Sequence, residues 1–138
     1  GIVAGGGVSF LAASSVLDSV QTSDADEKIG VEIIRKALEA PVRTIANNAG
    51  FEGSVVVEKI KALPTGQGLD SASGQYGDMI EMGVLDPVKV TRTTLQNAAS
   101  VASLILITEA TVSEMPKDTT IEESISRAAA QGGQGGMY

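Results

Sequence analysis

Hydrophobic residues recur at every third or fourth position along most of the chain, the spacing that places side chains on one face of an α-helix. Polar stretches rich in glycine, serine and aspartate separate these segments and predict loops at residues 21–26 and 64–74. The pattern predicts helical segments over residues 8–20, 25–49, 54–63, 76–82 and 87–107. We therefore expect a mainly α-helical fold, arranged as a helical bundle.

Local signals mark where several of these helices begin. Asp24 is followed three residues later by Glu27, the spacing of a capping box at a helix start. Pro41 removes a backbone donor inside the second segment, so we expect two helices that meet there, with Pro41 in the first turn of the second. Asp86 followed by Pro87 predicts an N-cap and the first position of the longest helix.

The longest predicted helix is apolar on nearly every side in its middle. Residues 98–107 contain no charged side chain, and their apolar positions are not confined to one face. A helix with this composition is normally buried on all sides. We therefore expect residues 98–107 to form the central helix of the core.

The pattern changes after this helix. Residues 109–115 alternate in character and predict a short β-strand over Thr111 to Met115, which Pro116 ends. No partner strand is predicted elsewhere, so we expect an edge strand that pairs with a segment outside this chain. Residues 117–138 end in a glycine-rich, low-complexity sequence and predict a flexible tail. The folded part is therefore expected to span residues 1–116.

Composition limits the classes of partner. The 138 residues are 43% hydrophobic and 20% charged, as is usual for one globular domain. Ten basic against seventeen acidic residues give a net charge of −7, which disfavours binding to nucleic acid. Two charge-free stretches, residues 1–17 and 93–108, are too polar or too short to cross a membrane. Because the chain begins with Gly1, we expect a segment of a longer protein.

The sequence contains no cysteine and no histidine, which removes several kinds of chemistry. Disulfides, thiolate nucleophiles, Cys/His zinc sites and histidine bases are all excluded. Catalysis would have to use carboxylates, hydroxyls, lysine or a metal held by oxygen ligands. The acidic residues at 24–32 are expected to form a solvated helix start, so no metal site is predicted.

Six motifs occur along the chain, at residues 1–8 (GIVAGGGV), 37–43 (ALEAPVR), 76–87 (YGDMIEMGVLDP), 89–92 (KVTR), 95–102 (LQNAASVA) and 135–137 (GGM). In this order they resemble the carboxy-terminal segment of the equatorial domain of GroEL-type (group I, bacterial 60 kDa) chaperonins. The resemblance covers residues 1 to about 116. The amino-terminal half of that domain, the intermediate domain and the substrate-binding apical domain have no counterpart here.

The resemblance implies an ATP-dependent protein-folding machine of the bacterial cytoplasm, with ATP and Mg²⁺ as cofactors. Its partners would be other subunits of a homo-oligomeric double ring, a co-chaperonin, and unfolded proteins bound by the absent domains. The family's catalytic aspartate lies upstream of residue 1, so no catalytic residue is expected in this chain and the isolated chain should be inactive. The predicted edge strand corresponds to a small sheet between subunits.

The resemblance also implies which residues contact the nucleotide. Gly5 and Gly6 would lie against the ribose and phosphates. The loop residues Asp70, Ser71 and Ala72 and the apolar side chain of Val84 would lie against the adenine. The carboxylate of Asp86 would contact the ribose hydroxyls. Asp70 and Ser71 replace an asparagine and an alanine of the family, and a carboxylate cannot donate a hydrogen bond to the adenine as an amide can.

Each of these features also has a purely structural explanation. Gly5 to Gly7 could serve only a tight turn and close packing, and they match neither G-x-G-x-x-G, because Phe10 holds the third glycine position, nor a P-loop. Asp86 could act only as a helix cap, and Asp70 to Ala72 only as polar loop residues. Met79 and Met82 are expected to fill the core.

Two hypotheses about function follow. The first is a segment of a chaperonin ATPase that is catalytic only in the complete subunit. The second is a non-catalytic helical assembly module that has kept the fold of this segment and lost nucleotide binding. The departure at Asp70 and Ser71 favours the second hypothesis, whereas the intact glycine triplet and Asp86 favour the first.

Overall fold

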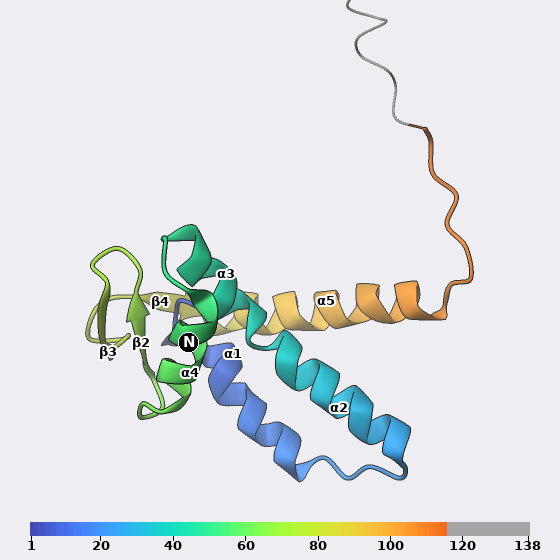
Figure 1. Ribbon diagram of the computed structural model, residues 1–138, viewed down its shortest axis with the longest axis horizontal. Helices are drawn as coiled ribbons and strands as arrows, with labels where there is room; N and C mark the ends of the chain where they lie inside the picture. Colours follow the sequence, from blue (N-terminus) through green and yellow to red (C-terminus); the bar gives the residue numbers. More distant parts are fainter. Residues whose placement is uncertain (116–138) are drawn as a thin grey trace, which may run out of the picture. The chain divides into compact units, whose positions relative to one another are not determined.

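The computed structural model describes residues 1–115, so the predicted tail at residues 117–138 lies outside the described part. The described residues are mainly helical with a few short strands, as the sequence predicts (Figure 1). In chain order the elements are β1 (Ile2–Ala4), α1 (Val8–Ala13), the 3₁₀-helix η1 (Ser14–Ser19), α2 (Ala25–Ala37), α3 (Ala40–Asn48), α4 (Gly53–Lys61), β2 (Gln67–Asp70), β3 (Gln75–Asp78), β4 (Leu85–Pro87) and α5 (Val88–Ile107). Contacts divide the chain into two units, residues 1–101 and 102–138.

The predicted helix starts at Asp24 and Pro41 are confirmed. The Oδ1 atom of Asp24 accepts a hydrogen bond from the backbone N–H of Glu27 at 2.9 Å. The Glu27 carboxylate in turn accepts from the backbone N–H of Ser23 at 2.6 Å, a bond that lowers the pKa of Glu27. Pro41 lies in the first turn of α3. Asp24 and Glu27 satisfy backbone donors at the start of a helix, and Pro41 has no backbone donor to satisfy there. Local sequence was therefore sufficient to predict both helix starts.

The helix predicted over residues 8–20 is present but changes type in its middle. It is α-helical as α1 and continues as the tighter 3₁₀-helix η1. The hydroxyl groups of Ser14, Ser15 and Ser19 each donate to a carbonyl oxygen three residues earlier. Such side-chain bonds compete with the α-helical ladder and favour the tighter winding.

The loop predicted at residues 64–74 is interrupted by strand β2 at residues 67–70, and the helix predicted at 76–82 is wrong. This part of the chain forms a β-hairpin in which β2 and β3 pair antiparallel, with Leu69 opposite Tyr76. The Asp70 carboxylate shapes the turn, accepting hydrogen bonds from the Ala72 N–H at 3.0 Å and the Ser73 hydroxyl at 2.5 Å. Strands of four residues are too short to show a clear periodicity, and their pairing outweighs the helical spacing of the apolar residues at 76–82.

Asp86 is not the N-cap of the longest helix. It lies in β4, which pairs antiparallel with β1 so that Val3 is opposite Asp86, and α5 begins only at Val88. The N–H of Val88 donates to the carbonyl oxygen of Gly1 at 3.1 Å and extends this pairing. The partner strand β1 is three residues long and far away in sequence, so local signals at Asp86 do not reveal it.

The core of the first unit lies where α1, α3 and α4 meet the two small sheets. Its buried members are Ala4, Val8, Leu11, Val42, Ala46, Val56, Val57, Ile60, Leu69 and Met79. Met79 is fully buried and Met82 packs against the cluster, so the expectation that these methionines fill the core is confirmed.

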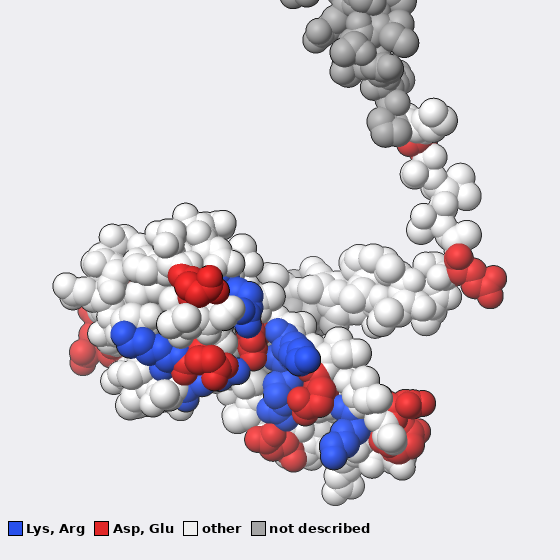
Figure 2. All heavy atoms as spheres, viewed as in Figure 1, with Lys and Arg blue, Asp and Glu red and all other residues white. Residues whose placement is uncertain are grey.

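Charged side chains of both signs intermingle on the visible surface of this unit (Figure 2). One such group joins α3 to α4, since Glu39 pairs with both Arg43 and Lys61 at 2.8 Å.

The predicted burial of residues 98–107 is wrong. The long helix α5 forms as predicted, but none of its residues is buried. Leu104 is 58% exposed and Leu106 is 84% exposed. In the face shown in Figure 2 the outer part of α5 carries no charged side chain. An apolar composition shows that a helix needs packing partners, but it does not show that those partners lie in the same chain.

The predicted strand over residues 111–115 is not present as a strand. Residues 110–115 have no regular secondary structure, and Val112 and Met115 are almost completely exposed. A strand requires a hydrogen-bonded partner, and no segment of the described residues pairs with this one. Pairing with a segment outside the chain therefore stays a prediction.

None of the helices within residues 1–115 is both long enough and apolar enough to pass through a membrane.

Candidate functional site

The pairing of β1 with β4 brings residues from opposite ends of the first unit into contact. The backbone N–H of Gly5 donates to the carbonyl oxygen of Val84 at 2.9 Å. A Cβ atom built on Gly5 would lie 3.0 Å from the carbonyl carbon and oxygen of Val84, so any other residue would have to push the two strands slightly apart. Asp86 follows two residues later in β4. The fold therefore collects Gly5, Gly6, Val84 and Asp86, four of the seven predicted site residues, around one short sheet.

The other two glycines of the triplet turn the chain from β1 into α1. Gly6 and Gly7 have φ angles of +65° and +84°, in the left-handed region that favours glycine. A Cβ atom on Gly7 would also lie 2.8 Å from the backbone nitrogen of Val42, in the first turn of α3. The turn and the close packing thus require glycine whether or not a ligand binds, and the structural explanation accounts for all three residues.

Asp86 has an arrangement that suits a ligand contact. The residue is partly exposed, and within residues 1–115 its carboxylate forms no hydrogen bond or ion pair. Both oxygens are therefore available to accept hydrogen bonds from hydroxyl groups. Val84, half-buried beside it, packs against the core and offers an apolar contact. Val84 and Asp86 thus offer an apolar surface and a carboxylate close to the glycine turn.

Asp70, Ser71 and Ala72 lie at the end of β2 and in the turn that follows. The bond from the Ser73 hydroxyl, together with the Ala72 N–H, lowers the pKa of Asp70, so this carboxylate is ionised and engaged in its own turn. Leu69, next to Asp70, approaches the glycine turn, since its carbonyl oxygen lies 4.0 Å from the Cβ position of Gly6. The hairpin is thus adjacent to the turn, but Asp70 has no donor with which to bind an adenine.

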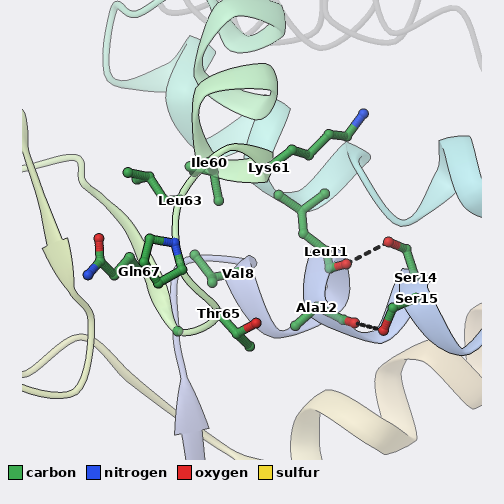
Figure 3. A pocket seen from close by; sticks show the side chains of 12 residues that line it. Val8, Leu11, Ala12, Ser14, Ser15, Ile60, Lys61, Leu63, Thr65 and Gln67 are labelled. Carbon is green, nitrogen blue, oxygen red and sulfur yellow. Dashed lines mark hydrogen bonds between the residues drawn. The ribbon is translucent and has the colours of Figure 1, made fainter.

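Sequence reasoning missed a groove of about 230 Å³ between α1 and the end of α4 (Figure 3). None of the seven predicted site residues lines it. The Ser14 and Ser15 hydroxyls in its wall donate to their own helix, and the Lys61 amine at its rim pairs with Glu39 and Glu58 at 2.8 Å. The Ser14, Ser15 and Lys61 groups of the groove are therefore engaged within the protein, and the candidate site rests on the geometry around Gly5 and Asp86.

A resident metal site is not evident in the described residues. No three or more Asp, Glu, Cys or His side chains among residues 1–115 come together in an arrangement that could hold a metal ion. The acidic residues at the start of α2 are exposed, and Asp24 and Glu27 are used to cap that helix. Any Mg²⁺ that accompanies a nucleotide here would need ligands from the nucleotide or from other parts of a larger protein.

Two comparisons with known proteins both find chaperonins. The fold is similar to that of the open-state monomer of a group II chaperonin from Methanococcoides burtonii, with a TM-score of 0.68 and 23% sequence identity. That similarity covers 78% of this chain and 28% of the other, so the chain spans less than a third of that chaperonin. The sequence profile of the TCP-1/cpn60 chaperonin family matches residues 1–116. On this match, together with the shared fold, the chain belongs to the TCP-1/cpn60 chaperonin family.

Proposed function

We propose that residues 1–116 are the carboxy-terminal part of the equatorial domain of an ATP-dependent protein-folding chaperonin. In the complete subunit this part supplies one wall of the nucleotide site and contacts between subunits of a homo-oligomeric double ring. The observation that carries the proposal is the Gly5–Val84 hydrogen bond of 2.9 Å, because this contact places the glycine turn beside Asp86.

The proposed wall divides into three contacts. The backbone of Gly5 and Gly6 lies against the ribose and phosphates, Val84 lies against the base, and Asp86 accepts hydrogen bonds from the ribose hydroxyls. The turn at Asp70, Ser71 and Ala72 lies at the adenine. Because the Asp70 carboxylate can only accept, any donor to the adenine from this turn is a backbone N–H.

Hydrolysis requires more than this chain. No catalytic residue is assigned within it, and its net charge of −7 repels ATP. We therefore place the phosphate-binding loops, the catalytic carboxylate and the Mg²⁺ ligands in the rest of the subunit. Bound Mg²⁺ offsets phosphate charge during hydrolysis. The 138-residue chain alone is then inactive as an ATPase.

The finer assignment is to the GroEL-type, group I chaperonins of the bacterial cytoplasm. It is supported by the motifs at residues 37–43, 76–87 and 135–137. With this assignment, the partners also include a co-chaperonin. The substrates are unfolded proteins, which other domains bind. The solved structure described above is a group II chaperonin, and at 23% identity its similarity supports the fold alone.

A second candidate function is a non-catalytic assembly module that has lost nucleotide binding. One specific observation favours it: Asp70, where the family has an asparagine, is engaged by Ser73 and Ala72 in its own turn. The two candidates differ in whether a nucleotide binds at the wall described here.

Nucleotide binding to the complete subunit separates the two candidates. We expect the unmodified subunit to bind ATP in titration calorimetry and Asp86→Ala to weaken binding by about tenfold, the loss of a charged hydrogen bond or two. Asp26→Ala removes the same charge from an exposed position in α2 and should leave affinity unchanged. Equal affinity of the Asp86→Ala and unmodified subunits would refute the assigned wall. No binding by the unmodified subunit would establish the assembly module instead.

The isolated chain provides a second test. In a phosphate-release assay with Mg²⁺, we expect its turnover to equal that of the buffer blank. Turnover above the blank that Asp86→Ala abolishes would show that the chemistry resides in this chain and would contradict the division of labour proposed here.

A further inference from the structure

We infer that Met79 is a positioning residue for the proposed nucleotide wall. Its side chain sets the distance between the glycine turn at residues 5–7 and strand β2, and its backbone is hydrogen-bonded to Val84. This inference rests on the proposed function, and it assigns a role to a residue that the sequence identifies only as core.

The side chain of Met79 occupies space that two glycines leave free. Met79 is 0% exposed. A Cβ atom on Gly6 would lie 3.0 Å from its Cε methyl, and a Cβ atom on Gly68 would lie 2.9 Å from its sulfur. The methionine therefore lies directly between the glycine turn and strand β2, and no side chain at position 6 or 68 separates it from either backbone.

The backbone of Met79 connects the same parts through hydrogen bonds. Its N–H donates to the carbonyl oxygen of Gly66 at 3.1 Å, and its carbonyl oxygen accepts from the N–H of Val84 at 2.8 Å. The carbonyl oxygen of Val84 then accepts from Gly5 at 2.9 Å. Two successive hydrogen bonds thus link Met79 to Gly5, while its methyl group contacts Gly6. All three segments of the proposed wall meet at this one residue.

The unbranched side chain suits this place. Methionine has three rotatable bonds and extends its methyl group to Gly6 while its sulfur contacts β2. Leucine has a similar volume, but it branches at Cγ and its side chain is one bond shorter. It therefore fills the core without reaching Gly6 in the same way. Alanine would leave a cavity below the turn, into which Gly5 and Gly6 could move away from Val84.

A truncation experiment in the complete subunit tests the role. We expect Met79→Ala to weaken ATP affinity by about tenfold, since small displacements of binding groups have effects of this order or larger. The matched control is Val57→Ala, because Val57 is equally buried but belongs to helix α4. It should lower the thermal stability while ATP affinity stays unchanged. Met79→Leu should retain the stability of the parent and still bind ATP more weakly.

A spectroscopic measurement separates positioning from general destabilisation. With ¹³C-methyl-labelled methionine, nucleotide binding should shift the NMR signal of the Met79 methyl, identified by its loss in Met79→Leu. The signal of Met115, which is 88% exposed, serves as the reference and should not move.

The outcomes distinguish this inference from the proposed function. If the unmodified subunit binds no nucleotide, both fail. If it binds nucleotide and Met79→Ala loses no more affinity than Val57→Ala, with no shift of the Met79 signal, the wall stands and the positioning role of Met79 is refuted. A loss of affinity in Met79→Leu at parental stability, together with the shifted signal, supports the inference.

Discussion

The amino group of Lys59 lies 3.6 Å from the centre of the Tyr76 ring. This contact joins the last turn of α4 to strand β3, across the core that supports the hairpin. A cation above an aromatic face is attracted to the electrons of the ring, and the attraction is of moderate strength at an exposed position. The contact therefore helps to hold the hairpin against the helical part of the first unit.

We expect Lys59→Met to destabilise the chain by ~0.5–1 kcal/mol, the usual strength of an exposed cation–π pair. Methionine keeps the aliphatic contact with the ring and removes only the charge. Urea unfolding at neutral pH measures the change. Lys28→Met, on exposed α2, is the control for loss of one positive charge and should have a smaller effect. Equal effects of the two substitutions would show that the ring contact contributes nothing.

A second prediction concerns pH. Hydrogen bonds from Lys61 and then Arg43 lower the pKa of Glu39 below its ordinary value of 4.5. The folded protein therefore takes up this proton less readily than the unfolded chain. The resulting stabilisation is complete above pH 4.5 and is lost as the pH falls through the lowered folded value.

The measurement is thermal unfolding of Glu39→Gln and the parent chain between pH 3 and 7. We expect the substitution to destabilise the protein at pH 7 and to have a progressively smaller effect as the pH falls and Glu39 takes up its proton in the folded state. Glu58→Gln, which removes an exposed partner of Lys61, should show a smaller dependence. The same stability difference at every pH would mean that the pairing of Glu39 does not depend on its charge.

A third prediction follows from the exposure of α5. In the isolated chain, Ala102→Asp should change the free energy of unfolding by less than ~0.5 kcal/mol, because position 102 is exposed. Ala46→Asp should cost about 3–5 kcal/mol, since Ala46 is 1% exposed and its surroundings are apolar. Thermal melting of both variants makes the comparison. Severe destabilisation by Ala102→Asp would mean that residues 98–107 are buried after all.

A fourth prediction concerns assembly of the proposed ring. Val112→Pro removes a backbone donor from the exposed segment at residues 111–115, which is expected to pair with a neighbouring subunit. In the complete subunit it should impair ring assembly in sedimentation experiments and leave the thermal stability of the protomer unchanged. Intact rings of Val112→Pro would exclude this segment as a joint.

Local sequence determined where helices α2 and α3 begin. The Asp24 cap and the position of Pro41 predicted the start of α2 and the break before α3, and both are present. These signals act between residues a few positions apart, through side-chain bonds to the backbone or a missing donor. They operate in the same way in any surroundings, so the sequence is enough to locate them.

The short strands required tertiary structure. Asp86 followed by Pro87 has the local signal of a helix cap, but pairing with Ile2–Ala4 places it in a strand. The same pairing brings Gly5 to Val84 and so creates the candidate site. The seven site residues came from the resemblance to a family, and only the fold shows that Asp86 has an unengaged carboxylate and that Asp70 does not. Hydrogen bonds between distant segments leave no periodicity in either segment.

Burial was the property that the sequence determined least. An apolar composition predicted that residues 98–107 of α5 are buried, but all of them are exposed, whereas Met79 is fully buried beneath the glycine turn. Glycines at positions 6 and 68 were a signal that neighbouring side chains fill their space, but only the fold identifies these as Met79 at Gly6, and Met79 together with Val8 at Gly68. The sequence determined which segments are helical and apolar; the tertiary structure decided which of them are covered, because exposure depends on the atoms that surround a residue and not on the residue itself.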